Sequence, residues 1–425
     1  MRVLFLHQNF PGQFLHVAAH LQREGGHDLV AVVPEANTRP RMVPTRTYRF
    51  DPRSVSTTVP LARYQAEQTA RGAAVAAELL TLKREGFTPD LIVGHGGWGE
   101  TLFARDVWPD VRILLHAEFF YSAGEAEAGF DPEFAGMRHD LFPLQIRAQN
   151  ANYSLALLDA DQGVAPTEWQ ASRFPAALRS KITVAHEGIN TDLVQPWPGA
   201  VVRLKQNGLV LRPGDEVVTF VSRNLEPHRG FHVFMRALPA ILARRPHAQV
   251  VIVGGDDTSY GPPPRGGGCW REVMLAEVGK RIDQKRVHFV GYVSYTALVR
   301  LLQISAAHVY LTYPFVLSWS MLDAMSAGAL VIGSRTQPVE EVISHYRNGL
   351  LVDFGDIDGL AEVVAGVLAT PKRFSSLRRA ARETMQARYD LRRVCLPVWL
   401  QLISDTIKKH LPKSNEELNV RLIHV

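Results

Sequence analysis

The sequence predicts an α/β fold with two Rossmann-like domains that face each other across a cleft. Two observations support this fold class. The chain starts with a short apolar strand, which is followed by a loop of turn-forming or charged residues and then by an amphipathic helix. The same succession begins again near Glu216. Apolar runs of strand length also alternate with helical patterns in both halves, which is typical of parallel βαβ units.

The first half begins with an expected strand at 3–6, and Pro11 and Gly12 force a loop after it. Beyond this loop the pattern predicts helices at 14–23, 66–84 and near 100–107, alternating with strands at 28–33, 90–94 and 111–116. Polar and glycine residues follow these strands. Open α/β sheets bind ligands at the carboxyl ends of their strands, so a ligand site is expected at this edge.

The second half begins with an expected strand at 216–222 and an amphipathic helix at 230–243. Further strands are predicted at 249–253, 288–289, 307–311 and 330–333, with helices between them. Because Pro and Gly interrupt the pattern at 195–214, the domains are expected to join there. The predicted organisation is a first domain at 1–200, a second at 201–385, and at 386–425 a C-terminal helix that packs back on the first domain, followed by a polar tail.

The composition narrows the possible functions. With 46% apolar and 21% charged residues, the 425-residue chain is neither disordered nor fibrous. Its two cysteines lie far apart, which excludes a disulfide scaffold and a cysteine-cluster metal site, and no apolar run is long enough to cross a bilayer, which favours a cytosolic protein. The net charge of +5 favours anionic small molecules, or a loose contact with a membrane surface, over nucleic acid. The basic cluster at 378–393 has helical spacing and is interpreted as a solvated helix face.

The most informative stretch, 313–334, predicts an anion site. Ser318 precedes a helix that starts near Trp319, and Gly328 ends it. The unpaired backbone N–H groups at such a helix start, and the positive end of its dipole, favour a phosphate. Asp323, near the first turns, is placed to accept hydrogen bonds from ribose hydroxyls, although acidic residues are also favoured there by the helix dipole alone.

A second constellation consists of Arg223 and Arg229, which follow the strand that opens the second half. Two guanidinium groups from one loop can clamp a diphosphate with multidentate hydrogen bonds, and neither loses its charge. The alternative is that both are surface arginines paired with Glu226.

The first domain offers further candidates. Gly12 gives the backbone room to approach a ligand, and Gln13 supplies an amide that both donates and accepts. The loop does not fit the GxGxxG pattern, which disfavours a nicotinamide-dependent dehydrogenase. His116 ends a strand two residues before Glu118, where it either contacts a substrate hydroxyl or satisfies local backbone groups.

Two segments have competing interpretations. Asp356 and Asp358 form a pair of the kind that holds a divalent ion, but Asp356 precedes a helix at 359–368, and N-capping is the better explanation. The Pro- and Gly-rich segment 260–268 is either a loop over the site or a surface excursion.

Over most of its length the chain resembles the family 4 retaining glycosyltransferases, which have the two-domain GT-B fold. In that family an Arg and, six positions later, a Lys contact the donor phosphates, and Arg223 and Arg229 stand at these positions. Of the two glutamates of the E-x7-E motif, the ribose-binding second is matched by Asp323, whereas Phe315 stands in place of the first, which contacts the donor sugar. The backbone N–H groups of Leu317, Ser318, Trp319 and Ser320 are expected to substitute for it.

Other segments extend the resemblance. Gly12 matches the family's glycine loop, and His116 matches the histidine that lies beside the reacting sugar. The segment 186–196 resembles the one that closes the first domain, and 348–356 resembles the final-strand segment.

The resemblance implies transfer of a sugar from a nucleotide-diphosphate sugar to an acceptor hydroxyl, with retention of configuration and without a metal or another cofactor. Arg223, Arg229 and the helix start would stabilise the leaving diphosphate, and His116 would orient the sugar or acceptor. The acceptor, which the sequence does not identify, is expected on the first domain, where Tyr48, Trp98, Phe119, Phe120 and Tyr121 offer aromatic faces.

Three other functions stay open. A nucleotide-sugar epimerase of the same fold would need an acid/base pair at the sugar. A nucleotide-sugar-binding protein without catalysis is made credible by Phe315. Nucleic-acid binding through the basic clusters is a distant third. The donor base, the donor sugar and the oligomeric state are not predicted.

Overall fold

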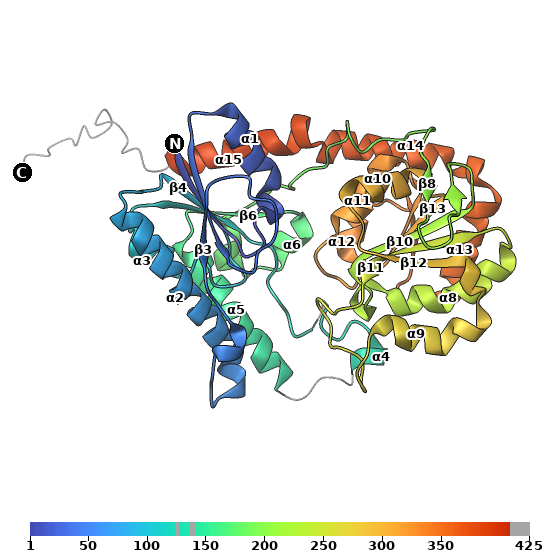
Figure 1. Ribbon diagram of the computed structural model, residues 1–425, viewed down its shortest axis with the longest axis horizontal. Helices are drawn as coiled ribbons and strands as arrows, with labels where there is room; N and C mark the ends of the chain where they lie inside the picture. The colour runs from blue at the N-terminus through green and yellow to red at the C-terminus, as the bar shows by residue number, and fades with distance from the viewer. Residues whose placement is uncertain (125–126, 136–140, 409–425) are drawn as a thin grey trace, which may run out of the picture.

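A computed structural model describes residues 1–124, 127–135 and 141–408 of the chain. It has two α/β domains side by side, and helices from the C-terminal part of the chain run along both (Figure 1). The polar tail, predicted beyond about His410, lies outside the described residues. Among the described helices, none combines the length and the apolar character needed to span a membrane.

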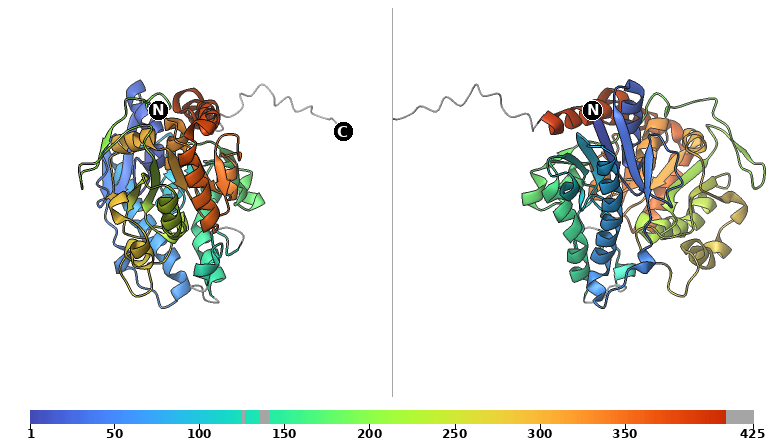
Figure 2. Two further views of the ribbon diagram at one scale, coloured as in Figure 1. Left: turned by 90° about the vertical axis from the view of Figure 1, so that its right-hand side faces the viewer. Right: turned by 60° about the vertical axis from the view of Figure 1, so that its left-hand side comes forward.

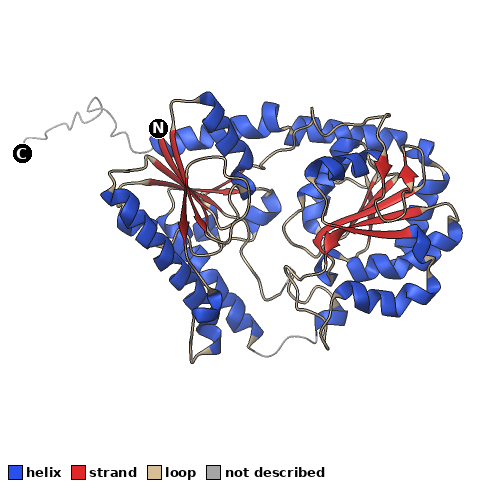
Figure 3. Cartoon of the chain, viewed as in Figure 1, coloured by secondary structure: helices blue, strands red, loops and turns tan. Residues whose placement is uncertain are grey.

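The first domain is a parallel sheet with helices on both faces (Figure 3). Its strands are β1 (Arg2–Leu6), β2 (Asp28–Pro34), β3 (Thr45–Tyr48), β4 (Leu91–His95), β5 (Arg112–His116), β6 (Gln162–Ala165) and β7 (Ile182–Val184). Its helices are α1 (Leu15–Glu24), α2 (Arg63–Arg84), α3 (Ala104–Val107), α5 (Phe142–Asp159), α6 (Glu168–Ser172) and α7 (Ala176–Arg179). The short helix α4 (Pro132–Ala135) belongs to the same half of the sequence but lies beside α9 (Trp270–Val278) on the second domain (Figure 1).

The second domain repeats this layered arrangement and begins with a small antiparallel hairpin. Its strands are β8 (Val202–Arg203), β9 (Val210–Leu211), β10 (Val217–Asn224), β11 (Gln249–Gly255), β12 (Val287–Gly291), β13 (Ala307–Tyr310), β14 (Val331–Ser334) and β15 (Leu350–Val352). The helices that follow are α8 (Phe231–Arg244), α9 (Trp270–Val278), α10 (Tyr295–Ile304), α11 (Trp319–Ala327), α12 (Gln337–Glu340), α13 (Ile357–Ala369), α14 (Ser375–Thr384) and α15 (Leu396–Lys408).

The central strands are apolar along their whole length because helices cover both faces of each sheet. In β1 the run from Val3 to Leu6 is buried, and β10 is buried from Val217 to Phe220. The side chains of the two faces enter different clusters: Leu4 packs toward α2, whereas Phe5 packs toward α1 and α15. This double burial explains why the apolar runs identified these strands in the sequence.

Each sheet has a point where the strand order reverses, and this point positions the site. In the described part of the chain the first sheet has the order β3-β2-β1-β4-β5-β6-β7, and the second has β12-β11-β10-β13-β14-β15. The reversal lies between β1 and β4 in the first sheet and between β10 and β13 in the second. In sheets of this kind ligands bind in the crevice outside the carboxyl ends of the strands at the reversal.

The C-terminal helix α15 packs on the first domain, although it follows the second in sequence (Figure 2). Its residues Leu396, Trp399 and Ile403 join the core cluster that contains Phe5 and Phe14. The Trp399 ring lies 6.4 Å from the ring of Phe14, and its Nε1 donates to the backbone oxygen of His186 at 3.1 Å.

Two sequence interpretations were wrong. The helix expected near 100–107 is only the short α3, because residues 96–103 form turns around the glycines that follow β4. The basic cluster at 378–393 is not simply a solvated face. Arg378 donates to the backbone oxygens of Gly328, which ends α11, and of Ala306, which precedes β13. Arg382 donates to the backbone oxygens of Thr191 and Val194 in the linker between the domains.

We expect Trp399→Ala to lower the free energy of unfolding by about 3–5 kcal/mol, because it removes a large side chain that is 1% exposed. Urea unfolding followed by circular dichroism measures this change. Val398→Ala on the same helix, at a side chain 40% exposed, is the matched control and should cost less than about 1 kcal/mol. Equal effects of the two substitutions would contradict the assigned packing of α15.

Candidate active site between the domains

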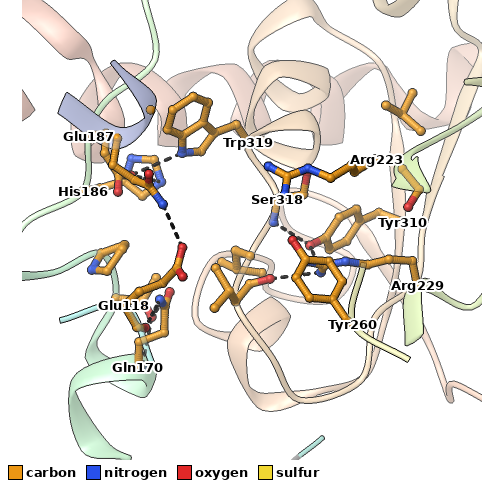
Figure 4. Close-up of a pocket in the computed structure, with 18 of the residues that line it drawn as sticks. Glu118, Gln170, His186, Glu187, Arg223, Arg229, Tyr260, Tyr310, Ser318 and Trp319 are labelled. Atoms are coloured by element: carbon orange, nitrogen blue, oxygen red, sulfur yellow. Dashed lines mark hydrogen bonds and ion pairs between the residues drawn. The ribbon is translucent and has the colours of Figure 1, made fainter. Parts of the chain in front are cut away.

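A cavity of about 270 Å³ lies where the carboxyl ends of the two sheets face each other. Its first-domain wall comes from the loops after β1, β2, β4, β5, β6 and β7, and its second-domain wall from β10 and the loops after β10, β11 and β13 (Figure 4). Of the residues predicted from the sequence, those that line it are Gly12, Gln13, Trp98, Arg223, Arg229, Leu317, Ser318 and Trp319. His116, Ser320 and Asp323 are not among the lining residues.

The second-domain wall is positively charged. Arg229 is buried, and its Nη1 donates to Thr312 Oγ1 at 2.8 Å and to the backbone oxygen of Val316 at 2.9 Å. Arg223 is exposed, and its guanidinium extends into the cavity (Figure 4). Both therefore face the same space, as the clamp requires.

The first domain adds a third cation, Arg39, to the lining. Partial burial and the neighbouring charge of Arg223 lower the pKa of the Arg39 guanidinium. Within residues 1–124, 127–135 and 141–408, neither Arg39 nor Arg223 has an ion pair with a carboxylate. The cavity thus holds positive charge that an anionic ligand can balance.

The alternative that the two arginines pair with Glu226 was wrong. Glu226 is buried, and its carboxylate accepts hydrogen bonds from the backbone N–H groups of Ser259, Tyr260 and Gly261 at 3.0–3.3 Å. It therefore fixes the base of the segment 259–261, and this brings the Tyr260 ring to within 5.0 Å of the Arg229 guanidinium.

Gly230 allows the chain to turn from Arg229 directly into α8. Its φ is +68°, and a Cβ at this position would lie 2.3 Å from Cβ of Leu311. Only glycine fits this conformation and this contact. The spacing between Arg229 and the start of α8 therefore depends on it.

The start of α11 points toward the cavity, but not all of its backbone N–H groups are available. The Ser318 N–H donates to the Tyr310 hydroxyl at 2.8 Å, and the Ser320 N–H donates to Ser318 Oγ, the N-cap. The N–H groups of Leu317 and Trp319 donate to no acceptor in the described residues. Of the four N–H groups predicted to bind the donor, two thus remain for an anion.

The first-domain wall carries two carboxylates, those of Glu118 and Glu187. Gln13 Nε2 donates to Glu118 Oε1 at 2.8 Å, and Gln13 Oε1 lies 2.7 Å from His7 Nε2. Burial would raise the pKa of Glu118, but His95, whose Nε2 lies 3.4 Å from Glu118 Oε2, brings that pKa down to about 2. Glu118 is therefore ionised.

Glu187 links the domains. Its Oε2 accepts a hydrogen bond from Trp319 Nε1 at 3.2 Å, and its Oε1 lies 3.0 Å from His116 Nε2. Burial acts to raise the pKa of Glu187, yet the charge of His186 and the hydrogen bond with His116 keep the pKa below its usual value. A carboxylate thus stands opposite the start of α11.

His116 does not face the cavity. It is fully buried, stacked 5.2 Å from the His95 ring, and its polar contact toward the cavity is Glu187. The expected direct contact with a sugar is therefore not available in this arrangement, because Glu187 stands between. His116 is a positioning residue for Glu187.

Gly12 lines the cavity, but the contact that requires a glycine at this position is with the His7 ring. Its φ is +45°, and a Cβ there would lie 2.7 Å from the ring of His7. The absence of a side chain thus lets His7 reach Gln13, the residue that contacts Glu118.

Asp323 lies inside the second domain, behind the cavity wall. Its side chain is 3% exposed and accepts a hydrogen bond from the Tyr295 hydroxyl at 3.0 Å. Burial raises the pKa of Asp323 to about 7. The proposed ribose contact of Asp323 stays a prediction, and it requires the Tyr295 hydroxyl to move.

Phe315 takes part in an aromatic contact between the domains. Its ring lies 4.8 Å from Phe119 of the first domain, and 4.7 Å from His228 and 5.0 Å from Tyr260 of the second. The position that holds a carboxylate in the family is thus apolar here. Because Tyr260 lines the cavity, the beginning of the segment 260–268 belongs to the site.

Metal-type ligands come together elsewhere. Within the described ranges, Asp131, Glu133 and His232 lie within metal-ligating distance of one another, outside the cavity. Arg236 already binds both carboxylate oxygens of Glu133, at 2.6 and 2.8 Å. Asp356, the other candidate, is the N-cap of α13 and accepts from the Gly359 N–H at 2.8 Å, which confirms the capping interpretation.

Several lining residues were not predicted from the sequence as parts of the site. They include Arg39, Gln170, Glu187 and Tyr310. Gln170 and Glu187 follow β6 and β7, so the general rule that ligands bind at strand ends would have found them had these strands been recognised. Arg39 lies in the irregular loop that follows β2, at the same edge of the sheet, where the same rule applies.

Family models match both halves of the chain. Residues 25–194 match the model described as Glycosyl transferase family 4 group, and residues 204–384 match Glycosyl transferases group 1.

Curated relatives are distant in sequence. The chain is 26% identical over 243 residues to a GDP-mannose-dependent alpha-(1-6)-phosphatidylinositol monomannoside mannosyltransferase of Mycolicibacterium smegmatis. The aligned region covers 53% of this chain and 57% of the relative. The chain is 25% identical over 230 residues to a D-inositol 3-phosphate glycosyltransferase of Streptomyces avermitilis, covering 52% and 47%. The chain thus spans about half the length of the curated relatives it matches.

Solved structures share the fold over nearly the whole chain. HepE of Anabaena in complex with UDP superposes with a TM-score of 0.66 at 17% identity, covering 95% of this chain and 100% of HepE. Sucrose-phosphate synthase from Thermosynechococcus elongatus gives a TM-score of 0.68 at 18% identity, with the same coverage. These similarities establish the two-domain fold that the sequence predicted.

Asp323→Asn should change how stability depends on pH. Because the pKa of Asp323 is raised on folding, the unfolded chain loses this proton near pH 4 and the folded chain only near pH 7. Wild-type stability should therefore fall by up to about 4 kcal/mol, relative to the Asn variant, as the pH rises through this interval. Chemical denaturation at pH 4.5, 6 and 8 measures the difference. Asp358→Asn, at an exposed position, should keep the wild-type profile, and parallel curves for wild type and Asp323→Asn would refute a buried, protonated Asp323.

Proposed function

Because the chain belongs to the family 4 glycosyltransferases, we propose that it transfers a sugar from a nucleotide-diphosphate sugar to an acceptor hydroxyl. One observation carries the proposal: Arg223, Arg229 and the start of α11 line a single cavity between the two domains. Two guanidinium groups and free backbone N–H groups in one cavity suit a diphosphate. The opposite wall, with Glu118 and Glu187, suits the hydroxyls of a sugar.

The transfer step breaks the bond between the anomeric carbon and a phosphate oxygen, and negative charge develops on the leaving diphosphate. Arg223, Arg229 and the N–H groups of Leu317 and Trp319 would stabilise this charge in place of a metal ion. Donors that are fixed before the reaction need no reorganisation as the charge develops. Arg229 is held in place by burial and by the two hydrogen bonds that its Nη1 donates to Thr312 and Val316.

We propose retention of configuration at the anomeric carbon. The acceptor oxygen attacks from the side that the diphosphate leaves, the new carbon–oxygen bond forms there, and the acceptor proton passes to the departing phosphate oxygen. The leaving group is thus its own base. His116 is not required for this proton, because it is buried behind Glu187.

Glu118 takes over the contact to the donor sugar that Phe315 cannot make. It lines the cavity that Arg223 and Ser318 line, it is ionised, and Gln13 fixes its orientation. An ionised carboxylate accepts strong hydrogen bonds from sugar hydroxyls. The carboxylate thus comes from the first domain.

A donor-binding protein without catalysis is the second candidate, and Phe315 is the observation that favours it. Incubation with UDP-glucose or GDP-mannose in the absence of acceptor separates the possibilities. Slow release of UDP or GDP supports a transferase, a new sugar nucleotide supports an epimerase, and binding without any product supports the second candidate. The cytosolic location and a contact with a membrane surface stay predictions.

We expect Arg223→Ala to lower kcat/KM for nucleotide release by about 10²–10³-fold, because it removes one stabilising group for the leaving diphosphate. Arg223 is exposed, so the melting temperature should not change. Arg223→Lys keeps the charge and should retain part of the activity. Arg244→Ala, at an exposed Arg of α8, is the control and should behave as wild type. A fully active Arg223→Ala variant would remove the proposal.

Glu118→Gln should weaken binding of UDP-glucose or GDP-mannose by about tenfold while leaving the affinity for free UDP or GDP unchanged, because only the sugar contact is lost. Isothermal titration of each ligand measures the two affinities. Glu35→Gln, at an exposed carboxylate outside the cavity, is the control. An equal loss of affinity for the free nucleotide would show that Glu118 acts on the fold of the site and not on the sugar.

A further inference from the structure

A second cavity, of about 580 Å³, adjoins the proposed donor cavity. The two share the side chains of Trp98 and Tyr260 in their walls. One side of the second cavity is formed by α2 and α5 of the first domain, and the other side by the second domain together with the segment 127–134, which packs on it. A molecule bound there would reach the donor cavity past the two shared residues.

The walls of this cavity are aromatic. Of the 21 described residues that line it, nine are Phe, Trp or Tyr, compared with 9% in the whole chain. They include Tyr64, Trp98 and Tyr121 of the first domain, and Tyr260, Trp270 and Phe315 of the second. Flat apolar faces with polar edges at their rims suit ring-shaped ligands that carry hydroxyls.

The charge of the second cavity is opposite to that of the donor cavity. Among the described residues of its wall, the charged side chains are Glu127 and Asp131, and neither Lys nor Arg occurs. Asp131 accepts a hydrogen bond from the Tyr313 hydroxyl at 2.9 Å and lies 3.0 Å from His232 Nε2. Among the described lining residues, a phosphate group bound here would meet two carboxylates and no Lys or Arg side chain.

A hydrogen-bonding group stands where the two cavities approach each other. His228 is 6% exposed, precedes Arg229 of the donor cavity, and lines the second cavity. Its ring lies between those of Tyr313 at 4.8 Å and Phe315 at 4.7 Å, and its Nε2 has no hydrogen-bond partner in the described chain. Burial and the charge of Arg229 hold the pKa of His228 well below its usual value, so the imidazole is neutral.

We infer that the second cavity binds the acceptor, and that this acceptor is an uncharged glycoside whose sugar or aromatic ring stacks on the cavity walls. Its reacting hydroxyl points past Trp98 and Tyr260 toward the donor, within reach of His228. The inference rests on the proposed transferase function and adds the class of the acceptor. It separates this chain from the two relatives named above, whose names refer to phosphatidylinositol and inositol 3-phosphate substrates.

The test compares neutral with phosphorylated acceptors. The probes are the p-nitrophenyl glucosides and mannosides, in both anomeric forms, together with glucose 6-phosphate and myo-inositol 3-phosphate. Binding is measured by titration in the presence of UDP or GDP, and transfer is measured with the matching sugar nucleotide. We expect at least one p-nitrophenyl glycoside to bind and accept sugar, and the phosphorylated compounds to bind at least about tenfold more weakly.

Two variants locate the binding site. Tyr64→Leu and Tyr121→Leu each remove an aromatic face from the second cavity only, so we expect about tenfold weaker glycoside binding. The affinity for UDP or GDP serves as the reference and should change less than about twofold. Tyr346→Leu, at a ring 64% exposed and outside both cavities, is the matched control.

The outcomes are distinct. Unchanged glycoside affinity in both variants would overturn the location, and tighter binding of a phosphorylated compound, or no binding of any glycoside, would overturn the acceptor class. Failure of the transferase proposal looks different, because then the wild-type chain would release no UDP or GDP from a sugar nucleotide, whether or not the nucleotide binds.

Discussion

Positive charge that forms no ion pair with a carboxylate among the described residues, held between two facing sheet edges, is the physical condition on which the site depends. Arg223 and Arg39 approach each other from different domains, and Arg229 lies buried beside them. Such an arrangement is unfavourable unless other groups fix the side chains and an anion occupies the space. The first condition is met by Thr312 and the Val316 carbonyl, which bind Arg229, and the cavity provides room for the second.

The site also requires that the domains stay together, because each contributes one kind of charge. Cations come mainly from the second domain and carboxylates from the first. Direct bonds span the gap: Glu187 binds Trp319, and the Glu341 carboxylate accepts the backbone N–H groups of Glu168 and Trp169 at 2.9 and 2.8 Å. Interfaces between domains of one chain are commonly small and adjustable, so these bonds, together with those of Arg236 to Glu133 and of Tyr313 to Asp131, set the spacing between the charges.

The sequence predicted the parts of the fold that are buried on both faces. The strands β1, β2, β10 and β11 are apolar runs, and each lies close to its expected bounds. The strand β3 (Thr45–Tyr48) was missed because it is a half-polar edge strand, and β6 and β7 because each is only three or four residues long. The same limit applies to the site. Arg223 and Arg229 are close in sequence and were recognised as a pair, whereas Glu187 meets Trp319 only through the approach of two domains, which no local pattern encodes.

The chain passes between the domains twice, and the two passages lie against each other. The Ile189 N–H donates to the Tyr389 carbonyl and the Leu391 N–H to the Ile189 carbonyl, both at 2.8 Å, while Thr191 binds Asp390, which is 199 residues further along the chain. Neither half is therefore a continuous stretch of sequence. A hybrid that combines one half of this protein with the other half of a relative needs two splice points, one on each passage. A hybrid with a single splice point would place the C-terminal helix of the relative against the β1 and α1 of this chain, whose surfaces pack against its own α15.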